Sequence, residues 1–127
     1  MKLSFSTKGW HNSTFDDFCE VAQDLHFEGI ELHNIYNRLF TDKNGAFHDY
    51  TAAATLRMLY EKKLQIPCLD TICDVADPHQ AEKSEDEIAR CLEIASNLHI
   101  QNVRLHAIDN SAPDAVEQVY SIVSKML

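Results

Sequence analysis

The sequence predicts an α/β fold, a (βα)4 unit in which four parallel strands alternate with four helices. Strand-like and helix-like segments alternate four times along the 127 residues, which is typical of parallel βα architecture. The composition, 45% hydrophobic and 24% charged, is that of an ordinary globular domain and excludes a disordered chain or a coiled coil. We expect the strands near residues 3–7, 30–34, 67–73 and 103–107.

The first two helices are expected between the first three strands. Ser13 and Thr14, followed by two acidic residues, predict a helix start. A polar stretch over residues 35–50, with an Asn-Gly turn, separates the second strand from a helix over residues 51–64. The side chains expected to face the core are Phe15, Phe18, Cys19, Ala22 and Leu25 in the first helix and Leu56, Tyr60 and Leu64 in the second.

Two further helices are expected after the third and fourth strands. A capping box, Ser-x-x-Glu over residues 84–87, predicts that the third helix begins there. Ser111 and Pro113 predict the start of the last helix. No linker-like or low-complexity stretch divides the chain, so residues 1–127 are expected to form one unit. The expected core faces are Ile88, Cys91, Leu92, Ala95 and Leu98 in the third helix and Val116, Val119, Tyr120 and Val123 in the fourth.

The net charge limits the partners of the chain. It has 11 Lys and Arg residues against 20 Asp and Glu residues, a formal net charge of −9. This charge repels nucleic-acid phosphates and anionic lipids, so we expect neither nucleic acid nor membrane as a partner. No apolar run approaches the roughly 20 residues of a membrane helix, and the first ten residues lack the apolar stretch of a signal peptide, which predicts a cytoplasmic protein. The four cysteines form no CxxC pair and are expected to be reduced core thiols.

One sequence repeat marks the second and fourth strands. The segment LHFEGIELH, residues 25–33, matches LHIQNVRLH, residues 98–106. The match suggests a two-unit repeat. The alternative is that any two junctions between a helix and a strand look somewhat alike, and the sequence leaves both interpretations open.

The repeat also places polar side chains, because residues alternate between the two faces of a strand. If the apolar residues pack against the helices, Glu31 and His33 face the other way on the second strand, and Arg104 and His106 do so on the fourth. In a (βα)8 barrel, Glu31 and Arg104 would share one interior layer, and the two histidines the next layer toward the mouth. Charged residues in such strands are costly unless they are paired or functional. A structural ion pair and a substrate-handling pair both remain open.

Four short segments resemble a known family. The opening KLSFST and the strands GIELHN, IPCLD and NVRLHA, spaced by amphipathic helices, resemble the N-terminal half of xylose isomerase-like TIM barrels. This family includes sugar phosphate isomerases and epimerases and, more distantly, metal-dependent AP endonucleases. The resemblance covers essentially the whole chain but half of the fold, since a complete (βα)8 barrel takes about 250 residues. It implies a (βα)4 half of a TIM barrel, either a fragment of a longer barrel or a self-associating unit.

The resemblance also implies an activity and its residues. Enzymes of this family move a proton between carbons of a small sugar or sugar phosphate, with a divalent metal such as Zn, Mn or Mg bound mostly by the later strands. Those strands lie beyond this sequence, so we expect the chain to be inactive alone. A divalent metal is expected in the complete barrel and is not firmly expected in this chain by itself. The residues carried over are Glu31 and His106 as catalytic groups, His33, Asp70 and Arg104 as substrate-binding groups, and His106 also as a candidate metal ligand.

Two kinds of function therefore remain open. The chain is either part of an isomerase or epimerase, or a non-catalytic half-barrel module that acts through assembly or ligand binding. An endonuclease is disfavoured because a net charge of −9 lacks the basic track that DNA requires. Four parallel strands leave two open edges, which a second half, a second copy of the chain or an open α/β sandwich could close.

The remaining five histidines carry weaker expectations. His26 and His99 precede strands on the N-terminal face of the sheet, where packing or helix capping is expected. His11, His48 and His79 fall in loops that follow strands, on the face where active sites lie. Loop histidines are more often solvated than catalytic, so none of these three is assigned to the site.

Overall fold

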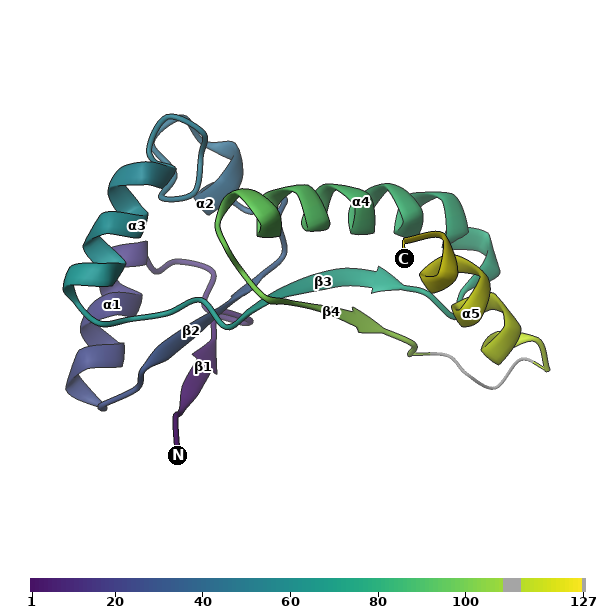
Figure 1. Ribbon diagram of the computed structural model, residues 1–127, viewed down its shortest axis with the longest axis horizontal. Helices are drawn as coiled ribbons and strands as arrows, with labels where there is room; N and C mark the ends of the chain where they lie inside the picture. Colours follow the sequence, from purple (N-terminus) through teal and green to yellow (C-terminus); the bar gives the residue numbers. More distant parts are fainter. Residues whose placement is uncertain (109–112, 127) are drawn as a thin grey trace.

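The computed structural model describes residues 1–108 and 113–126. Four strands form one sheet in the order β1-β2-β3-β4 (Figure 1). Each neighbouring pair is parallel, so the predicted α/β fold and its four strands are confirmed. The strands are β1 (Ser4–Ser6), β2 (Gly29–His33), β3 (Cys68–Asp74) and β4 (Asn102–His106).

Helices alternate with these strands. They are α1 (Phe15–Asp24), α2 (Arg38–Thr41), α3 (Ala52–Glu61), α4 (Ala81–Asn97) and α5 (Ala115–Met126), with a 3-10 turn η1 (Pro78–Gln80) before α4. The sequence did not predict α2 or η1, because elements of three or four residues show no periodicity. The α2 helix begins where the Asn37 side chain accepts a hydrogen bond from the Leu39 N–H at 2.8 Å, a regular N-cap contact.

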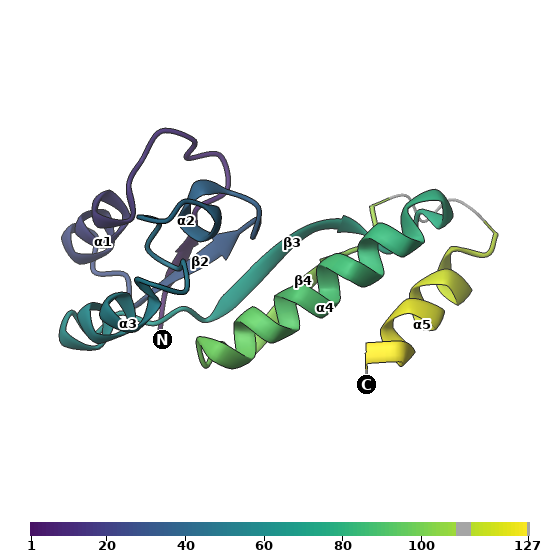
Figure 2. The ribbon, with the colours of Figure 1, turned by 90° about the horizontal axis from the view of Figure 1, so that it is seen from above.

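The helices supply the apolar cover of the sheet. α1 and α3 lie at the end of the molecule that holds β1 and β2, and α4 runs along β3 and β4 (Figures 1 and 2). A second, smaller cluster packs the end of β3 against α4 and α5. Burial of such side chains is the main favourable term in folding. The largest fully buried side chains of the main cluster are Phe18, Ile30, Leu32, Ile35 and Leu69.

Three of the helices bury a face slightly different from the predicted one. α3 buries Thr55 and Leu59, and α5 buries Ala115 and Ile122. Each residue of a helix turns by about 100°, so a shift of one position exchanges core and solvent. The predicted core residues that are exposed are Leu25, just after α1, Tyr60 in α3, Leu92 in α4, and Val116 and Tyr120 in α5.

The predicted start of α4 is wrong, whereas that of α1 is confirmed. Thr14 and Asp17 form the capping box of α1, each side chain accepting the other's backbone N–H. α4 instead begins at Ala81, and Ser84 is buried inside it, with its hydroxyl donating to the Asp74 carbonyl at 3.4 Å. The Ser-x-x-Glu pattern of α4 faces β3 and does not cap the helix. Ser111, the other predicted start, lies outside the described residues, and α5 begins at Ala115.

Three helices end in the same backbone motif. His26, Lys63 and His99 follow α1, α3 and α4 with φ angles of 59°, 56° and 57°. The pattern is the Schellman motif, here without glycine. His26 and His99 therefore end helices, as predicted. Both copies of the sequence repeat contain this helix end, and Lys63, outside the repeat, forms the same helix end after α3. The closing N–H groups, each 2.8–2.9 Å from its carbonyl, run from Phe27 to Ala22, from Leu64 to Leu59 and from Ile100 to Ala95.

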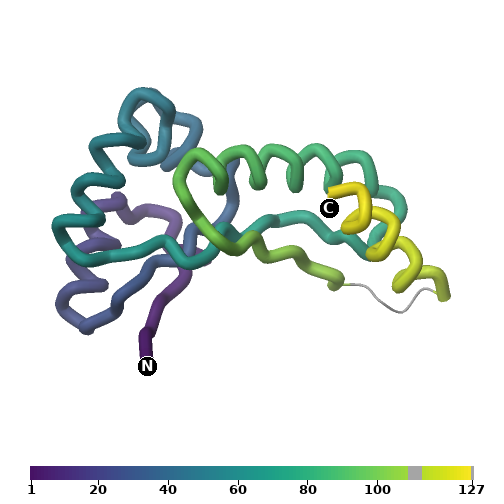
Figure 3. Tube along the Cα trace, viewed as in Figure 1, coloured from purple at the N-terminus to yellow at the C-terminus, as the bar shows by residue number. Residues whose placement is uncertain are grey.

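The N-terminal elements lie at one end of the molecule and α5 at the other, and α4 runs back between β3 and β4, as the colours of Figure 3 show. Within the described residues, β1 pairs only with β2 and β4 only with β3, so both remain edge strands. Among those same residues, no helix has the length and apolarity needed to cross a bilayer.

Candidate active site

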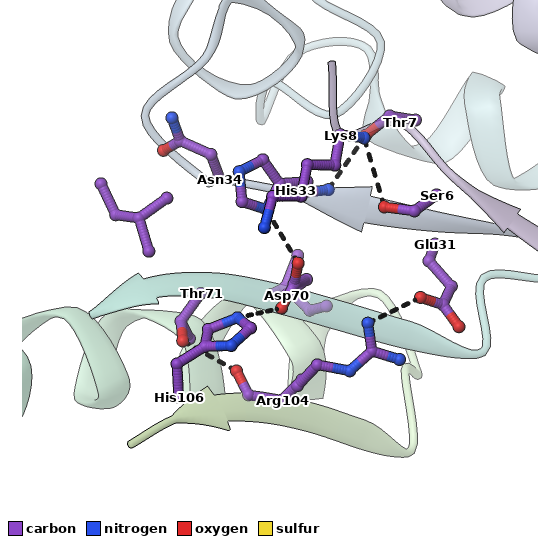
Figure 4. A network of polar contacts seen from close by, with 12 residues as sticks. Ser6, Thr7, Lys8, Glu31, His33, Asn34, Asp70, Thr71, Arg104 and His106 are labelled. Carbon is purple, nitrogen blue, oxygen red and sulfur yellow. Dashed lines mark hydrogen bonds and ion pairs between the residues drawn. The ribbon is translucent and has the colours of Figure 1, made fainter. Parts of the chain in front are cut away.

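Five polar side chains lie together on the three strands β2, β3 and β4. On β2, Ile30 and Leu32 are fully buried in the core, while Glu31 and His33 are partly exposed, as strand alternation predicts. Figure 4 shows these two side chains together with Asp70 of β3 and with the last polar residues of β4. The five residues predicted from the sequence, Glu31, His33, Asp70, Arg104 and His106, are thus brought together; their roles remain predictions.

Asp70 joins the two histidines. Its Oδ2 lies 2.8 Å from His33 Nδ1, and its Oδ1 lies 2.7 Å from His106 Nε2 (Figure 4). The Asp70 side chain is 2% exposed, whereas the imidazoles of His33 and His106 are 20% and 27% exposed. A buried carboxylate is costly unless its oxygens are paired, and both oxygens of Asp70 are paired here.

These contacts decide which ring nitrogen of each histidine is available. An ionised carboxylate can only accept hydrogen bonds, so each imidazole donates an N–H to Asp70. In the neutral ring, the lone pair then lies on His33 Nε2 and on His106 Nδ1. Within the described residues, neither of these nitrogens has a hydrogen-bond partner. A ring nitrogen with a free lone pair is the group that a general base requires.

An irregularity in β3 brings His106 to Asp70. The register places Asp70 opposite both His33 of β2 and Arg104 of β4, whereas His106 lies opposite Asp74. β3 thus uses four residue steps where β4 uses two. The Thr71 hydroxyl donates to the Arg104 carbonyl at 2.7 Å and so fills part of this gap.

A buried carboxylate of α4 holds the same irregular stretch. Glu87, which is buried, accepts the Ile72 N–H at 2.8 Å. A backbone N–H that has left the strand ladder needs another partner, and Glu87 supplies one. Glu87 therefore holds the irregular stretch of β3 that follows Asp70, a contact that the sequence did not predict.

Glu31 and Arg104 form the neighbouring layer. Arg104 Nη1 lies 3.0 Å from Glu31 Oε2, and the Ser4 hydroxyl lies 3.5 Å from Glu31 Oε1. The hydrogen bond with Glu31, and then its negative charge, raise the pKa of the Arg104 guanidinium above its ordinary value. The sequence left open whether these two residues touch, and the structure shows that they do. The arrangement matches the two predicted layers, with the ion pair in one and the histidines in the next.

The described residues do not form a complete metal centre. No group of three or more His, Cys, Asp or Glu side chains among residues 1–108 and 113–126 is arranged to hold an ion. Both Asp70 oxygens accept from imidazoles, which leaves two free ring nitrogens, His33 Nε2 and His106 Nδ1. Two imidazole nitrogens are too few for a structural or catalytic zinc site, which uses at least three protein ligands.

The loop after β2 fixes the position of His33. The His33 N–H donates to the Thr7 hydroxyl at 3.0 Å, and its carbonyl accepts from the Asn37 side chain at 2.7 Å. Asn34 follows with a φ of 65°, and its N–H donates to the Asp70 carbonyl at 2.8 Å. Asparagine tolerates this left-handed conformation better than most residues. The contacts of Thr7, Asn34 and Asn37 were not predicted from the sequence, although asparagines shortly after a strand are a recognisable turn signal.

The loop histidines divide into one near the site and two away from it. His11 lines a cavity that His33 also lines. His48 stacks near Tyr50, with ring centroids 5.0 Å apart, and its Nδ1 accepts the Tyr50 N–H. His79 lies exposed in η1. The structure therefore adds only His11 to the neighbourhood of the site.

Comparison with known proteins shows the fold. Neither protein-family models nor curated proteins match the sequence. Among solved structures, the chain is similar to the probable 3-DHS dehydratase AsbF involved in petrobactin synthesis from Bacillus anthracis, with a TM-score of 0.70 and 21% identity over 99% of this chain and 46% of that one. The fold is half of a xylose isomerase-like TIM barrel.

A second solved structure agrees with this result. It is a xylose isomerase domain protein from Planctomyces limnophilus, with a TM-score of 0.65 and 16% identity, covering 98% of this chain and 48% of that one. The chain spans about half the length of each neighbour. The resemblance noted in the sequence is thus confirmed at the level of the fold.

Proposed function

We propose that this chain is one half of a barrel enzyme that moves a proton between carbons of a small sugar or sugar phosphate, as isomerases and epimerases do. The observation that carries the proposal is the pair of imidazoles that share the buried Asp70 and each keep one ring nitrogen free. The names of the two structural neighbours, a dehydratase and a xylose isomerase domain protein, fit a reaction that begins with proton removal from carbon.

The two histidines act as an acid and a base when the cluster holds one extra proton. The neutral imidazole takes the proton from the carbon next to the substrate carbonyl, and the imidazolium donates its proton to the carbonyl oxygen. Reversal of the two transfers on the neighbouring atoms gives the isomer and restores the cluster. Asp70 keeps both rings oriented through its two contacts.

Glu31 and Arg104 hold the substrate one layer below the histidines. Their ion pair presents carboxylate and guanidinium groups to the hydroxyls of a polyol. Glu31, predicted from the sequence as a catalytic group, therefore binds substrate in this mechanism, while the two histidines move the protons. The hydrogen bond and the charge of Glu31 raise the pKa of Arg104 and so favour its charged form. Its side chain is 45% exposed, which leaves it accessible to a ligand.

A divalent metal, Zn, Mn or Mg, belongs to the proposal only for the complete barrel. It would polarise the substrate carbonyl. Among the described residues, His106 Nδ1 is the candidate ligand and no group of three or more ligands is arranged to hold an ion, so no step is derived through the metal here. The ligands would come from whatever completes the barrel.

The open edges suggest what the chain needs for activity. β1 and β4 each have one strand neighbour within the described residues, and exposed strand edges pair readily with other strands. We propose that a second half of the barrel, on the same chain or from a second copy, pairs with both edges. The expected compartment is the cytoplasm, because four free and buried thiols suit a reducing environment.

Binding of a sugar by the chain tests the proposal. The ring C–H signals of the histidines are followed by NMR while D-xylose or D-ribose 5-phosphate is added. We expect saturable shifts at His33 and His106, and binding weaker by about tenfold in His33→Ala and in His106→Ala, because each loses one hydrogen bond to the ligand. His79→Ala, in an exposed turn, is the matched control and keeps wild-type affinity.

Two outcomes would contradict this proposal. Saturable binding that neither histidine substitution weakens would remove the two imidazoles from the site. The second outcome is that the chain binds no sugar and contains no metal. With the solution mass measured by light scattering on the same sample, this result would favour the non-catalytic module.

A further inference from the structure

A cavity of about 300 Å³ opens beside His33, where β1 and β2 end. Its wall is formed by the loops that follow these two strands and includes the aromatic ring of Trp10. That ring is fixed by Phe5 and Phe18, with centroids 5.8 and 5.7 Å away. The volume is at the lower end of the range for small-ligand sites.

The charge of this cavity differs from that of the chain. The chain carries nine more acidic than basic residues, yet no Asp or Glu lines the cavity, and Arg38 does. Two other cavities contain carboxylates: one, which Arg38 also lines, has Asp16 and Asp42, and another has Asp86 and Glu87. Within the described residues, Arg38 forms no ion pair.

The polar groups around Arg38 suit an acceptor-rich ligand. The Asn34 side-chain oxygen accepts the Tyr36 N–H at 3.0 Å, which leaves the amide NH₂ to donate. Figure 4 shows this amide turned away from Asp70. The guanidinium of an arginine matches a carboxylate or a phosphate, with two parallel hydrogen bonds.

We propose that this cavity holds the anionic group, carboxylate or phosphate, of a small hydroxylated ligand, with Arg38 as its cation and Asn34 as a further donor. The inference deepens the proposed function, on which it rests, because the cavity includes His33. A ligand anchored at Arg38 presents its hydroxyl or carbonyl end toward His33 Nε2. Trp10 offers a flat apolar surface to the C–H groups between the two ends.

Three related ligands test the proposal by calorimetry: D-ribose, D-ribonate and D-ribose 5-phosphate. The wild-type chain is expected to bind at least one of the two anions about tenfold more tightly than ribose, the gain typical of a charge-assisted contact. Whether ribonate or ribose 5-phosphate gains more distinguishes a carboxylate from a phosphate. In Arg38→Gln this preference disappears and the affinity for ribose stays the same.

Arg57→Gln is the matched control, since Arg57 is an exposed arginine of α3 outside the cavity. It is expected to keep the preference for the anion. The proposal is overturned if the wild type binds the three ligands equally, if none of them binds, or if Arg38→Gln keeps the preference.

The same titrations separate this proposal from the proposed function. If ribose binding depends on His33 and His106 but the anions gain nothing, the proton-transfer site stands and the anion site fails. If the anion preference depends on Arg38 while substitution of the two histidines changes nothing, the anion site stands and the proton-transfer proposal fails.

Discussion

The two faces of β3 differ in what their residues do, although the residues are neighbours in the sequence. Leu69 and Asp70 are both almost completely buried. Leu69 belongs to the apolar cluster between the sheet and the helices. Asp70 points to the opposite face of the sheet and binds two histidines there. One face therefore stabilises the fold, and the other arranges charged and titratable groups at the expense of burying a carboxylate.

The largest effect on stability is expected from Leu69→Ala on the helix face. It removes a fully buried side chain and leaves a cavity, which costs about 2–5 kcal/mol of unfolding free energy. Urea unfolding measures the change, and Leu69→Val is a milder variant if the first does not fold. Leu92→Ala, on the exposed side of α4, should change the unfolding free energy little. Equal losses at Leu69 and Leu92 would contradict the assigned core.

Asp70→Asn is expected to lower the stability less than Leu69→Ala does, but to disrupt the contacts that hold His33 and His106 together. The side chain keeps its volume but loses its charge and one of its two acceptor oxygens, so the unfolding free energy falls by about 2 kcal/mol. Sugar binding should disappear in this variant although it remains folded. Asp49→Asn, an exposed carboxylate in the loop before α3, serves as the control. Retained sugar binding in Asp70→Asn would show that the cluster is structural only.

The buried cysteine thiols of α1 and α4 should make the protein less stable at alkaline pH. Burial raises the pKa of the Cys91 thiol from 9.0 to about 12 and that of Cys19 to about 11. The neutral thiols therefore favour the folded state fully below pH 9, and this contribution is lost as the pH rises from 9 toward 12.

Cys91→Ala isolates this effect. The wild type should lose about 1 kcal/mol more than Cys91→Ala between pH 8 and pH 10, because the unfolded chain ionises a thiol that the folded chain keeps protonated. Urea unfolding at both pH values gives the difference. Parallel pH dependence of the two proteins would mean that the Cys91 thiol is not protected.

The smallest effect is expected from the Glu31 and Arg104 ion pair. Its members are 19% and 45% exposed, so water screens their attraction. A double-mutant cycle with Glu31→Gln and Arg104→Gln should give a coupling of about 0.5 kcal/mol in the unfolding free energy. Ligand affinity should fall more than stability does. A coupling well above 1 kcal/mol, with ligand binding unchanged, would assign the pair to structure.

Much of the arrangement could be predicted from local patterns. Alternation along β2 and β4 separated Glu31, His33, Arg104 and His106 from the apolar residues, because strand geometry sends neighbours to opposite faces. The faces of α3 and α5 could not be predicted as well. Tyr60 and Val116 are apolar enough for a core, and only the neighbouring elements decide which side of a helix is covered.

The sequence by itself determined the order of the four strands and the four longer helices, the parallel sheet and the identity of five polar residues on its strands. The tertiary structure decided that Asp70 is the centre of the site, since its two hydrogen bonds join residues 37 and 36 positions apart. It also decided that Glu87 serves β3 and that Arg38 lines a cavity without carboxylates. Such contacts depend on the register between strands and on the irregular stretch of β3, which no local pattern specifies, because they form only when distant segments pack together.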